Sequence, residues 1–212
     1  MLAMGQHVVS VDEKTGIQAL ERVRATLEMK SGHVEKQEFE YIRHGTQSLI
    51  ASFSVASGEI IFASMQKTRK EEDFVEHIKG SVKTDPNGRW VFVVDQLNTH
   101  KSASLVEFVA EYCGIKDDLG EKGCKGILKS MESRKKFLEQ PRQIQFVYTP
   151  RHSSWLNQVE LWFSILARRL LKRASFKSVE ELKQRVLDFI DFFNRTMAKP
   201  FKWTYTGVPS SK

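Results

Sequence analysis

Cysteine, proline and long apolar runs are all scarce in this 212-residue chain, and these scarcities exclude several classes of protein. The two cysteines, Cys113 and Cys124, form no CxxC pair, which argues against a disulfide framework or a zinc ribbon. No apolar stretch approaches the ~18–20 residues that cross a bilayer, and the N-terminus lacks the charged-then-apolar order of a signal peptide. We therefore expect a cytoplasmic protein without membrane contact.

Positive charge is concentrated in the last third of the chain. Residues 141–212 hold 13 Lys and Arg against 5 Asp and Glu, whereas residues 1–140 hold 20 against 21. Such asymmetry is typical of a surface that faces a polyanion, because Lys and Arg release counterions from phosphates. A solvated basic helix face would give the same count, so charge alone leaves both interpretations open.

Hydrophobic periodicity predicts an α/β domain that occupies residues 1–212. Apolar stretches indicate strands at residues 7–12, 47–56, 59–65, 90–94 and 144–148. Helical spacing indicates helices at residues 69–83, 102–112 and 155–173. A last helix is predicted to begin at a capping box formed by Ser178 and Glu181, and Pro200 bars its continuation. This order predicts a mixed sheet, with an antiparallel three-strand start and then parallel strands, flanked by helices. Ser57-Gly58 is predicted to be a two-residue hairpin turn, and the weakly periodic segment 114–142 is interpreted as an insertion.

Three acids occupy positions where a solvated charge is unusual. Asp12 ends the first predicted strand, Asp95 follows the most apolar one, and Glu160 lies in an aromatic helix. A carboxylate near apolar groups costs several kcal/mol unless a basic group or a divalent cation compensates it. Three carboxylates suit a pair of hard cations such as Mg²⁺, roughly 3.5–4 Å apart. Each acid could instead be an ordinary turn or surface residue, and Glu13 rivals Asp12 because adjacent strand residues point to opposite faces.

Three segments carry a resemblance to a known family. VDEKTGIQAL (11–20), VVDQLNTHKS (93–102) and YTPRHSSWLNQVELWFSIL (148–166) resemble the motif blocks of mariner-like DDE/D transposases, in their bacterial insertion-sequence branch. The resemblance implies an RNase H-like fold in which Asp12, Asp95 and Glu160 form a catalytic triad that binds two Mg²⁺ or Mn²⁺ ions. It also implies double-stranded DNA with transposon ends as substrate, TA as target dinucleotide, and a homodimer that pairs two ends.

The sequence departs from the family pattern in two respects. The 64 residues between Asp95 and Glu160 exceed the spacing typical of the wider group, and the predicted insertion at 114–142 accounts for the excess. A surface insertion costs little free energy because loop entropy grows only logarithmically with length. Relatives also carry an N-terminal helix-turn-helix region, which we expect to be absent because this sequence begins almost at the first catalytic strand. Sequence-specific binding of transposon ends is therefore not expected from these residues.

Several polar residues near the triad are candidates for DNA contact. His100 and Lys101 follow Asp95 into a predicted helix N-terminus, where backbone N–H groups attract phosphate, although a cap followed by solvated residues fits equally. Arg151 and His152 are predicted to contact the DNA backbone or to support Glu160, and the alternative is solvation in a loop. Asn157 is predicted to orient Glu160. Two further basic sets are candidate phosphate contacts or solvated residues: Arg168, Arg169, Lys172 and Arg173 after Glu160, and Lys129, Arg134, Lys135 and Lys136 in the insertion.

The function predicted from these patterns is metal-dependent DNA cleavage followed by strand transfer in the same site. Two alternatives stay open at this point. One is a catalytically silent remnant that binds DNA or oligomerises, and the other is an RNase H-like nuclease without strand transfer.

Overall fold

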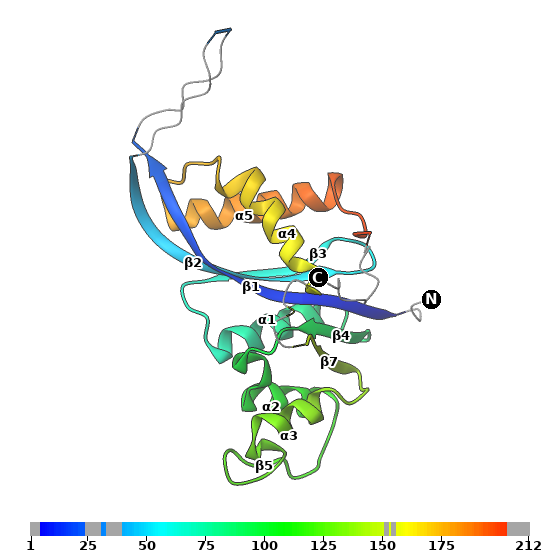
Figure 1. Ribbon diagram of the computed structural model, residues 1–212. Helices are drawn as coiled ribbons and strands as arrows, with labels where there is room; N and C mark the ends of the chain where they lie inside the picture. Colours follow the sequence, from blue (N-terminus) through cyan, green and yellow to red (C-terminus); the bar gives the residue numbers. More distant parts are fainter. Residues whose placement is uncertain (1–4, 24–30, 33–39, 151–152, 154–155, 203–212) are drawn as a thin grey trace, which may run out of the picture.

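The computed structural model describes residues 5–23, 31–32, 40–150, 153 and 156–202, and within them a five-stranded sheet forms the centre of the molecule (Figure 1). Its spatial order is β3-β2-β1-β4-β7. The strands are β1 (Gln6–Arg22), β2 (Tyr41–Ser54), β3 (Ile60–Gln66), β4 (Arg89–Val94) and β7 (Ile144–Tyr148). β1, β2 and β3 pair antiparallel, whereas β4 is parallel to both β1 and β7. The predicted RNase H-like mixed sheet is confirmed.

Helices cover both faces of the sheet (Figure 1). One face carries α1 (Glu71–Lys83), α2 (Ala103–Tyr112) and α3 (Met131–Leu138), and the other carries α4 (Val159–Leu166) and α5 (Val179–Thr196). Ser178 caps α5 by accepting from the backbone N–H of Glu181 at 3.0 Å, as the sequence predicts. Among the described residues, no helix is both long enough and apolar enough to cross a membrane.

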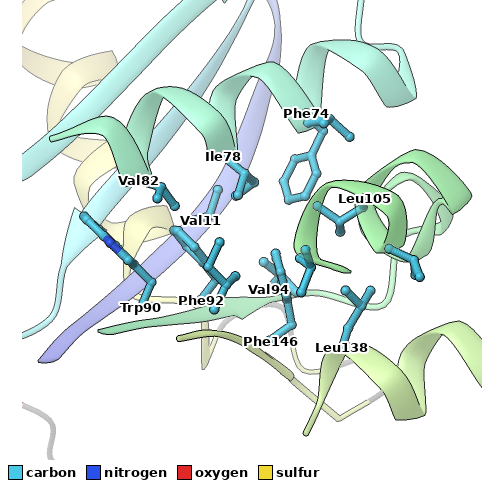
Figure 2. Close-up of a cluster of buried hydrophobic side chains, with 14 of the residues drawn as sticks. Val11, Phe74, Ile78, Val82, Trp90, Phe92, Val94, Leu105, Leu138 and Phe146 are labelled. Carbon is cyan, nitrogen blue, oxygen red and sulfur yellow. The ribbon is translucent and has the colours of Figure 1, made fainter. Parts of the chain in front are cut away.

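Aromatic and branched side chains of β4 and β7 form the core beneath α1 and α2 (Figure 2). The Trp90 and Phe92 rings stack at 5.6 Å, and Phe92 stacks on Phe146 of β7 at 5.4 Å. β4 is a central strand, so a continuous apolar run suits it better than an alternating pattern. β7 is the last strand in the sheet order, and its buried residues Ile144, Phe146 and Tyr148 alternate with more exposed ones.

β1 is longer than predicted, because Lys14, Thr15 and Gly16 do not end it. Pairing with β2 shifts register between Lys14 and Ile17 and then continues to Arg22. Gly16 adopts a φ of 70°, a conformation that glycine reaches without a side-chain clash, so the strand accommodates the irregularity. The prediction that Asp12 ends the first strand is therefore wrong: Asp12 lies inside β1.

The β2–β3 hairpin is confirmed, but its predicted two-residue turn is wrong. The backbone N–H of Ser54 donates to Glu59 O at 2.8 Å, so four residues separate the closing pair. Gly58 has a φ of 78°, and a Cβ there would lie 2.0 Å from Lys199 O. The close passage of residue 199 therefore requires glycine at this position.

The segment 114–142 folds into ordered structure. It contains a short hairpin, β5 (Gly120–Glu121) with β6 (Lys125–Gly126), a 3₁₀ turn η2 (Ile127–Lys129), and α3. Leu128, Phe137 and Leu138 are buried in the core beneath the sheet. The segment is therefore an integral part of that face, and its being an insertion relative to relatives stays a prediction.

A fully buried histidine links α1 to the antiparallel strands. His77 of α1 lies between Ser52 Oγ of β2, 2.9 Å from Nε2, and Ser64 Oγ of β3, 2.8 Å from Nδ1. Neutral imidazole both donates and accepts, so the two hydroxyls satisfy it without a charge. Burial lowers the pKa of His77 from 6.5 to about 3, because a charged ring would lose its hydration.

We predict that His77 makes folding stability depend on pH. The imidazole is protonated below about pH 6.5 in the unfolded chain but stays neutral in the folded protein until about pH 3. Its contribution is therefore complete above pH 6.5 and is lost as pH falls toward 3, at about 1.4 kcal/mol per pH unit. Between about pH 7 and pH 5, the unfolding free energy of the parent should fall by about 2 kcal/mol relative to His77→Gln in urea denaturation. The other histidines cancel in this difference, and parallel curves for the two proteins would contradict the prediction.

Candidate acidic site at the sheet edge

Two predicted acids lie side by side where β1 and β4 run parallel. The parallel register pairs Ser10 with Val93. Continuing that register by two residues on each strand brings Asp12 level with Asp95, which directly follows β4. Asp12 is 8% exposed, whereas the Asp95 side chain is 30% exposed. The carboxyl end of β4 thus presents one buried and one half-buried acid.

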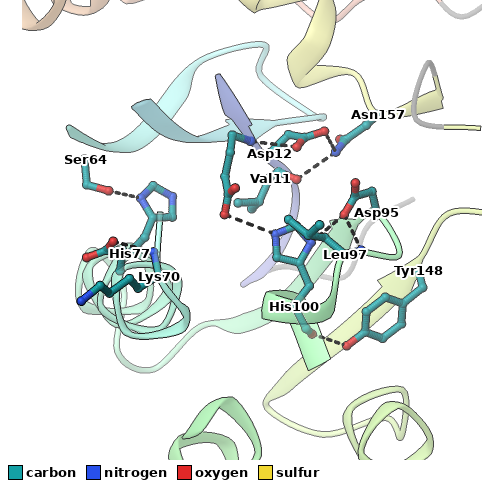
Figure 3. Close-up of polar contacts among 12 residues, drawn as sticks. Val11, Asp12, Ser64, Lys70, His77, Asp95, Leu97, His100, Tyr148 and Asn157 are labelled. Carbon is teal, nitrogen blue, oxygen red and sulfur yellow. Dashed lines mark hydrogen bonds and ion pairs between the residues drawn. The ribbon is translucent and has the colours of Figure 1, made fainter. Parts of the chain in front are cut away.

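Asn157 connects Asp12 to the helix that carries the third acid (Figure 3). Its Nδ2 donates to Val11 O at 2.8 Å and to Asp12 Oδ2 at 3.1 Å. Ser10 donates its hydroxyl to Asn157 Oδ1, and Ser10 Oγ accepts from the backbone N–H of Val159 at 2.9 Å. These bonds hold the start of α4 on β1. The prediction that Asn157 orients Glu160 is replaced by this contact with Asp12.

Sequence reasoning missed Ser10, although a signal was present. Residues two apart on a strand share a face, so Ser10 lies on the same side of β1 as Asp12. A buried hydroxyl inside an otherwise apolar strand needs a polar partner. Here the partner, Asn157, is 147 positions away along the chain, and only the fold identifies it.

His100 is buried between two carboxylates on the other face of β1 (Figure 3). Its Nδ1 lies 2.8 Å from Asp95 Oδ1 and its Nε2 lies 3.7 Å from Glu13 Oε1. Burial alone would lower the pKa of His100, but the close contact with Asp95 and the nearby carboxylate of Glu13 outweigh it and raise the pKa to about 9. His100 is therefore a buried cation that compensates both acids, which neither a cap nor a solvated residue would do.

The two neighbouring aspartates have pKa values shifted in opposite directions. Burial foremost, together with the charges of Asp95 and Glu160, raises the pKa of Asp12 to about 6 despite the hydrogen bond from the backbone N–H of Glu13. Partial burial also raises the pKa of Asp95, but His100 outweighs that effect and leaves its pKa below the ordinary value. Both other predicted acids thus act to raise the pKa of Asp12, and the charge of His100, which acts to lower it, does not outweigh burial and these acids.

Glu160 lies in the first turn of α4 and is exposed. The negative charge of Glu160 is one of the causes that raise the pKa of Asp12. Within the described residues, no three His, Cys, Asp or Glu side chains are close enough together to hold one metal ion. The joint binding of ions by Asp12, Asp95 and Glu160 therefore stays a prediction. Their donor chemistry fits a hard cation, since all three supply carboxylate oxygen and crowd negative charge around Asp12.

Lys101 belongs to the same strand-end turn. The 3₁₀ turn η1 (Asn98–Lys101) follows Asp95, and Ser102 caps α2 by accepting from Leu105 N–H at 3.1 Å. Lys101 is only 9% exposed, with Nζ 3.3 Å from Gln96 Oε1. The alternative of solvated residues is therefore wrong for His100 and Lys101.

Arginines that follow Glu160 line a groove. After α4 the chain forms a π-helical turn, η4 (Ala167–Leu171). A cavity of about 580 Å³ lies there, lined by Ile165, Arg168, Arg169, Arg173 and Met197. Lys172 is exposed, and its backbone carbonyl accepts from the Arg22 guanidinium at 3.2 Å. Three of the four predicted basic residues thus share one surface. Arg151 and His152 lie outside the described residues.

A mixed sheet in this order, flanked by helices and acidic at the edge where β1 and β4 run side by side, defines an RNase H-like domain. The family profile described as "DDE superfamily endonuclease" matches residues 7–183. The chain belongs to this family. No curated protein matches it in sequence.

Solved structures of Mos1 transposase share the fold. The catalytic domain of Mos1 mariner transposase aligns with a TM-score of 0.53 at 10% identity, covering 90% of this chain and 72% of that one. A pre-cleavage Mos1 transpososome aligns with a TM-score of 0.56 at 12% identity, covering 87% of this chain and 48% of that one. A Mos1 paired end complex with Mn gives 0.55 at 14% identity, with 89% and 51% covered. This chain thus spans about half the length of the chains in these DNA complexes.

We predict that Asn157 is needed to hold α4 on β1. Asn157→Ala removes the bonds to Ser10, Val11 O and Asp12 and leaves buried polar atoms unpaired. The free energy of unfolding should fall by about 2–3 kcal/mol in urea denaturation. Asn98→Ala, at an exposed asparagine of η1, is the matched control and should change stability by less than about 0.5 kcal/mol. Equal losses in the two variants would refute the assigned role.

Proposed function

We propose that this chain is the catalytic domain of a DDE-type transposase that cleaves DNA and transfers the cleaved strand to target DNA. The observation that carries the proposal is the register that brings Asp12 level with Asp95, with the helix that bears Glu160 held on β1 through Asn157 and Ser10, in a chain that belongs to the DDE endonuclease family. In-line phosphoryl transfer needs positioning and charge neutralisation rather than a covalent nucleophile. Carboxylates alone repel a phosphate, so this acidic site can position it and neutralise its charge only through bound cations.

Asp12, Asp95 and Glu160 are the residues that would hold two Mg²⁺ or Mn²⁺ ions. Such ions, when bound, lower the pKa of a water molecule and neutralise charge on the phosphate. A Mn-containing Mos1 complex supports the choice of metal. Asn157 would fix the orientation of the Asp12 carboxylate, and His100 that of Asp95. Glu160 is exposed, so its side chain is free to swing toward the two aspartates.

Double-stranded DNA would lie along the basic surfaces near these acids. Arg168, Arg169 and Arg173 line a groove on the helix that continues from Glu160, where phosphates would compensate their charge. Arg151 and His152 would contact the backbone from the segment just before α4. Backbone contacts of this kind position a duplex without reading its sequence.

The finer features of the proposal come from the resemblance of the motif blocks. We propose a homodimer that pairs two transposon ends, TA as the target dinucleotide, and membership of the bacterial insertion-sequence branch. The DNA-bound Mos1 structures support a DNA partner. Activity in the cytoplasm, where a bacterial genome lies, follows from that assignment.

We predict that DNA cleavage requires the carboxylates of both Asp95 and Glu160. Asp95→Asn and Glu160→Gln should each lower nicking of supercoiled plasmid DNA in Mg²⁺ or Mn²⁺ by at least about 100-fold, because each removes a metal ligand. Asp191→Asn and Glu107→Gln, at exposed acids of α5 and α2, are matched controls and should nick like the parent.

Glu160→Gln is the more informative of the two variants. It replaces an exposed residue, so the fold should persist and a loss of cleavage can be attributed to the carboxylate. Melting temperatures check this for every variant. Parent-like cleavage by Asp95→Asn or Glu160→Gln would refute the triad. Cleavage without joining of the product to target DNA would instead identify an RNase H-like nuclease that lacks strand transfer.

One observation favours a second candidate, the catalytically silent remnant. In the described part of the chain no three potential ligands stand close enough to share an ion. A protein that has lost its chemistry would keep the basic DNA surface with acids that never converge. Metal binding, measured without any substrate, separates this candidate from the transposase.

We predict that Mn²⁺ stabilises the parent and that Asp12→Asn removes the effect. At a hundredfold excess over Kd, a ligand of the folded state adds about 2.7 kcal/mol, or roughly 5–10 °C for a chain of this size. In EDTA, Asp12→Asn should melt no lower than the parent, because it relieves the repulsion from Asp95 and Glu160. A parent unaffected by Mn²⁺ would support the silent remnant, and an equal rise in the variant would place the ion elsewhere.

A further inference from the structure

The segment 114–142 closes a cavity against the turn that follows Asp95. The cavity measures about 840 Å³, within the range of ordinary ligand sites. One wall comes from the ends of β4 and β7, through Gln96, Lys101 and Pro150 among others. The other wall is α3, through Met131, Glu132 and Lys135. The site therefore exists only because this segment folds back toward the acidic edge.

Adjacent basic residues of α3 have different surroundings. Arg134 is 7% exposed and donates through Nη1 to Lys101 O at 3.0 Å and through Nε to Ser130 O at 3.1 Å. Its guanidinium is thus committed to holding η1 against α3. Lys135 points into the cavity, keeps a 25% exposed side chain, and lies 3.6 Å from Glu139.

Two lysines from distant parts of the chain flank one aromatic ring. Lys135 Nζ lies 5.6 Å and Lys101 Nζ 5.8 Å from the centre of the Tyr148 ring. The Tyr148 hydroxyl donates to His100 O at 2.6 Å, so the ring is fixed to the turn that carries Lys101 (Figure 3). Cation–π attraction to the ring, together with Glu139 beside Lys135 and the charge of Asp95 acting with Lys101, holds both ammonium groups at the cavity. Both belong to the cavity that borders the acidic site.

We propose that this cavity binds a backbone phosphate of the DNA strand that leaves the acidic site, with Lys101 on one wall and Lys135 on the other. The proposal rests on the proposed function and names a substrate contact from the segment 114–142. Lysine is a point-charge donor suited to phosphate, and the exposed Asn98 amide adds a donor from the same wall. The Gln96 amide already donates to Thr149 O at 2.7 Å and accepts from Lys101 Nζ at 3.3 Å. Glu132, the acid of the lining, lies 3.9 Å from Lys136 and is thereby partly compensated.

Lys136 provides a matched control for Lys135. It is the next residue of the same helix, carries the same charge, has a 72% exposed side chain, and does not line the cavity. Lys135→Ala and Lys136→Ala change the net charge of the chain equally. Any difference between their affinities for DNA therefore reflects where the lysine lies, in the cavity or outside it. Lys135→Arg keeps the charge and should preserve binding.

The test is the affinity of the whole chain for a short fluorescein-labelled duplex of arbitrary sequence, measured by anisotropy in EDTA over a range of salt. Lys135→Ala should bind about fivefold more weakly than the parent, and the slope of log K against log salt should fall by about 0.9, the loss of one phosphate contact. Lys136→Ala should stay within about twofold. Melting temperatures confirm that all variants are folded.

Equal weakening by Lys135→Ala and Lys136→Ala, no change in Lys135→Ala, or no duplex binding by the parent would each overturn the proposal. Because the assay contains no metal, it is separate from cleavage. Position-dependent binding without nicking would uphold this contact while refuting the transposase, and nicking with no special effect of Lys135 would do the reverse.

Discussion

Parallel pairing of β1 with β4 is the constraint on which the arrangement of charge in this protein depends. The two strands are aligned by apolar side chains, with Val9 opposite Phe92 in the register and both fully buried. The same register places Asp12 level with Asp95 two residues later. Hydrophobic burial therefore brings together two carboxylates that would separate if electrostatics alone acted.

Negative charge is compensated differently on the two faces of β1. On the α1 and α2 side, Glu13 and Asp95 share the buried cation His100. On the α4 side, Asp12 has an amide, Asn157, and the backbone N–H of Glu13 as its neutral partners, and it faces the charges of Asp95 and Glu160. One side is compensated within the chain. The other retains an acidic environment that a cation would relieve, which is the physical basis of the proposed chemistry.

Several features were predictable because a local pattern decided them. The continuous apolar run at 90–94 suits a covered central strand, and at 144–148 buried residues alternate with more exposed ones. Ser178 and the buried residues Leu182, Val186 and Ile190 specify α5. Other features depended on partners elsewhere: residues 14–16 resemble a turn, but β2 pairs on both sides of the irregularity and keeps the strand intact. The segment 114–142 has weak periodicity, yet Phe137 and Leu138 pack into the core that β4 and β7 complete.

The amino-acid sequence by itself determined the order of strands and helices, the positions of the acids, and the motif blocks that indicate the family, because these depend on residue type and short spacing. Only the tertiary structure decided which charges meet. His100 is a buried cation because the fold encloses it beside Asp95 and brings Glu13, 87 positions earlier in the chain, within 3.7 Å. Asn157 orients Asp12 because α4 docks on Ser10. Electrostatic and hydrogen-bond partners act over a few ångströms in space, and no pattern within one segment records neighbours that the fold brings from another.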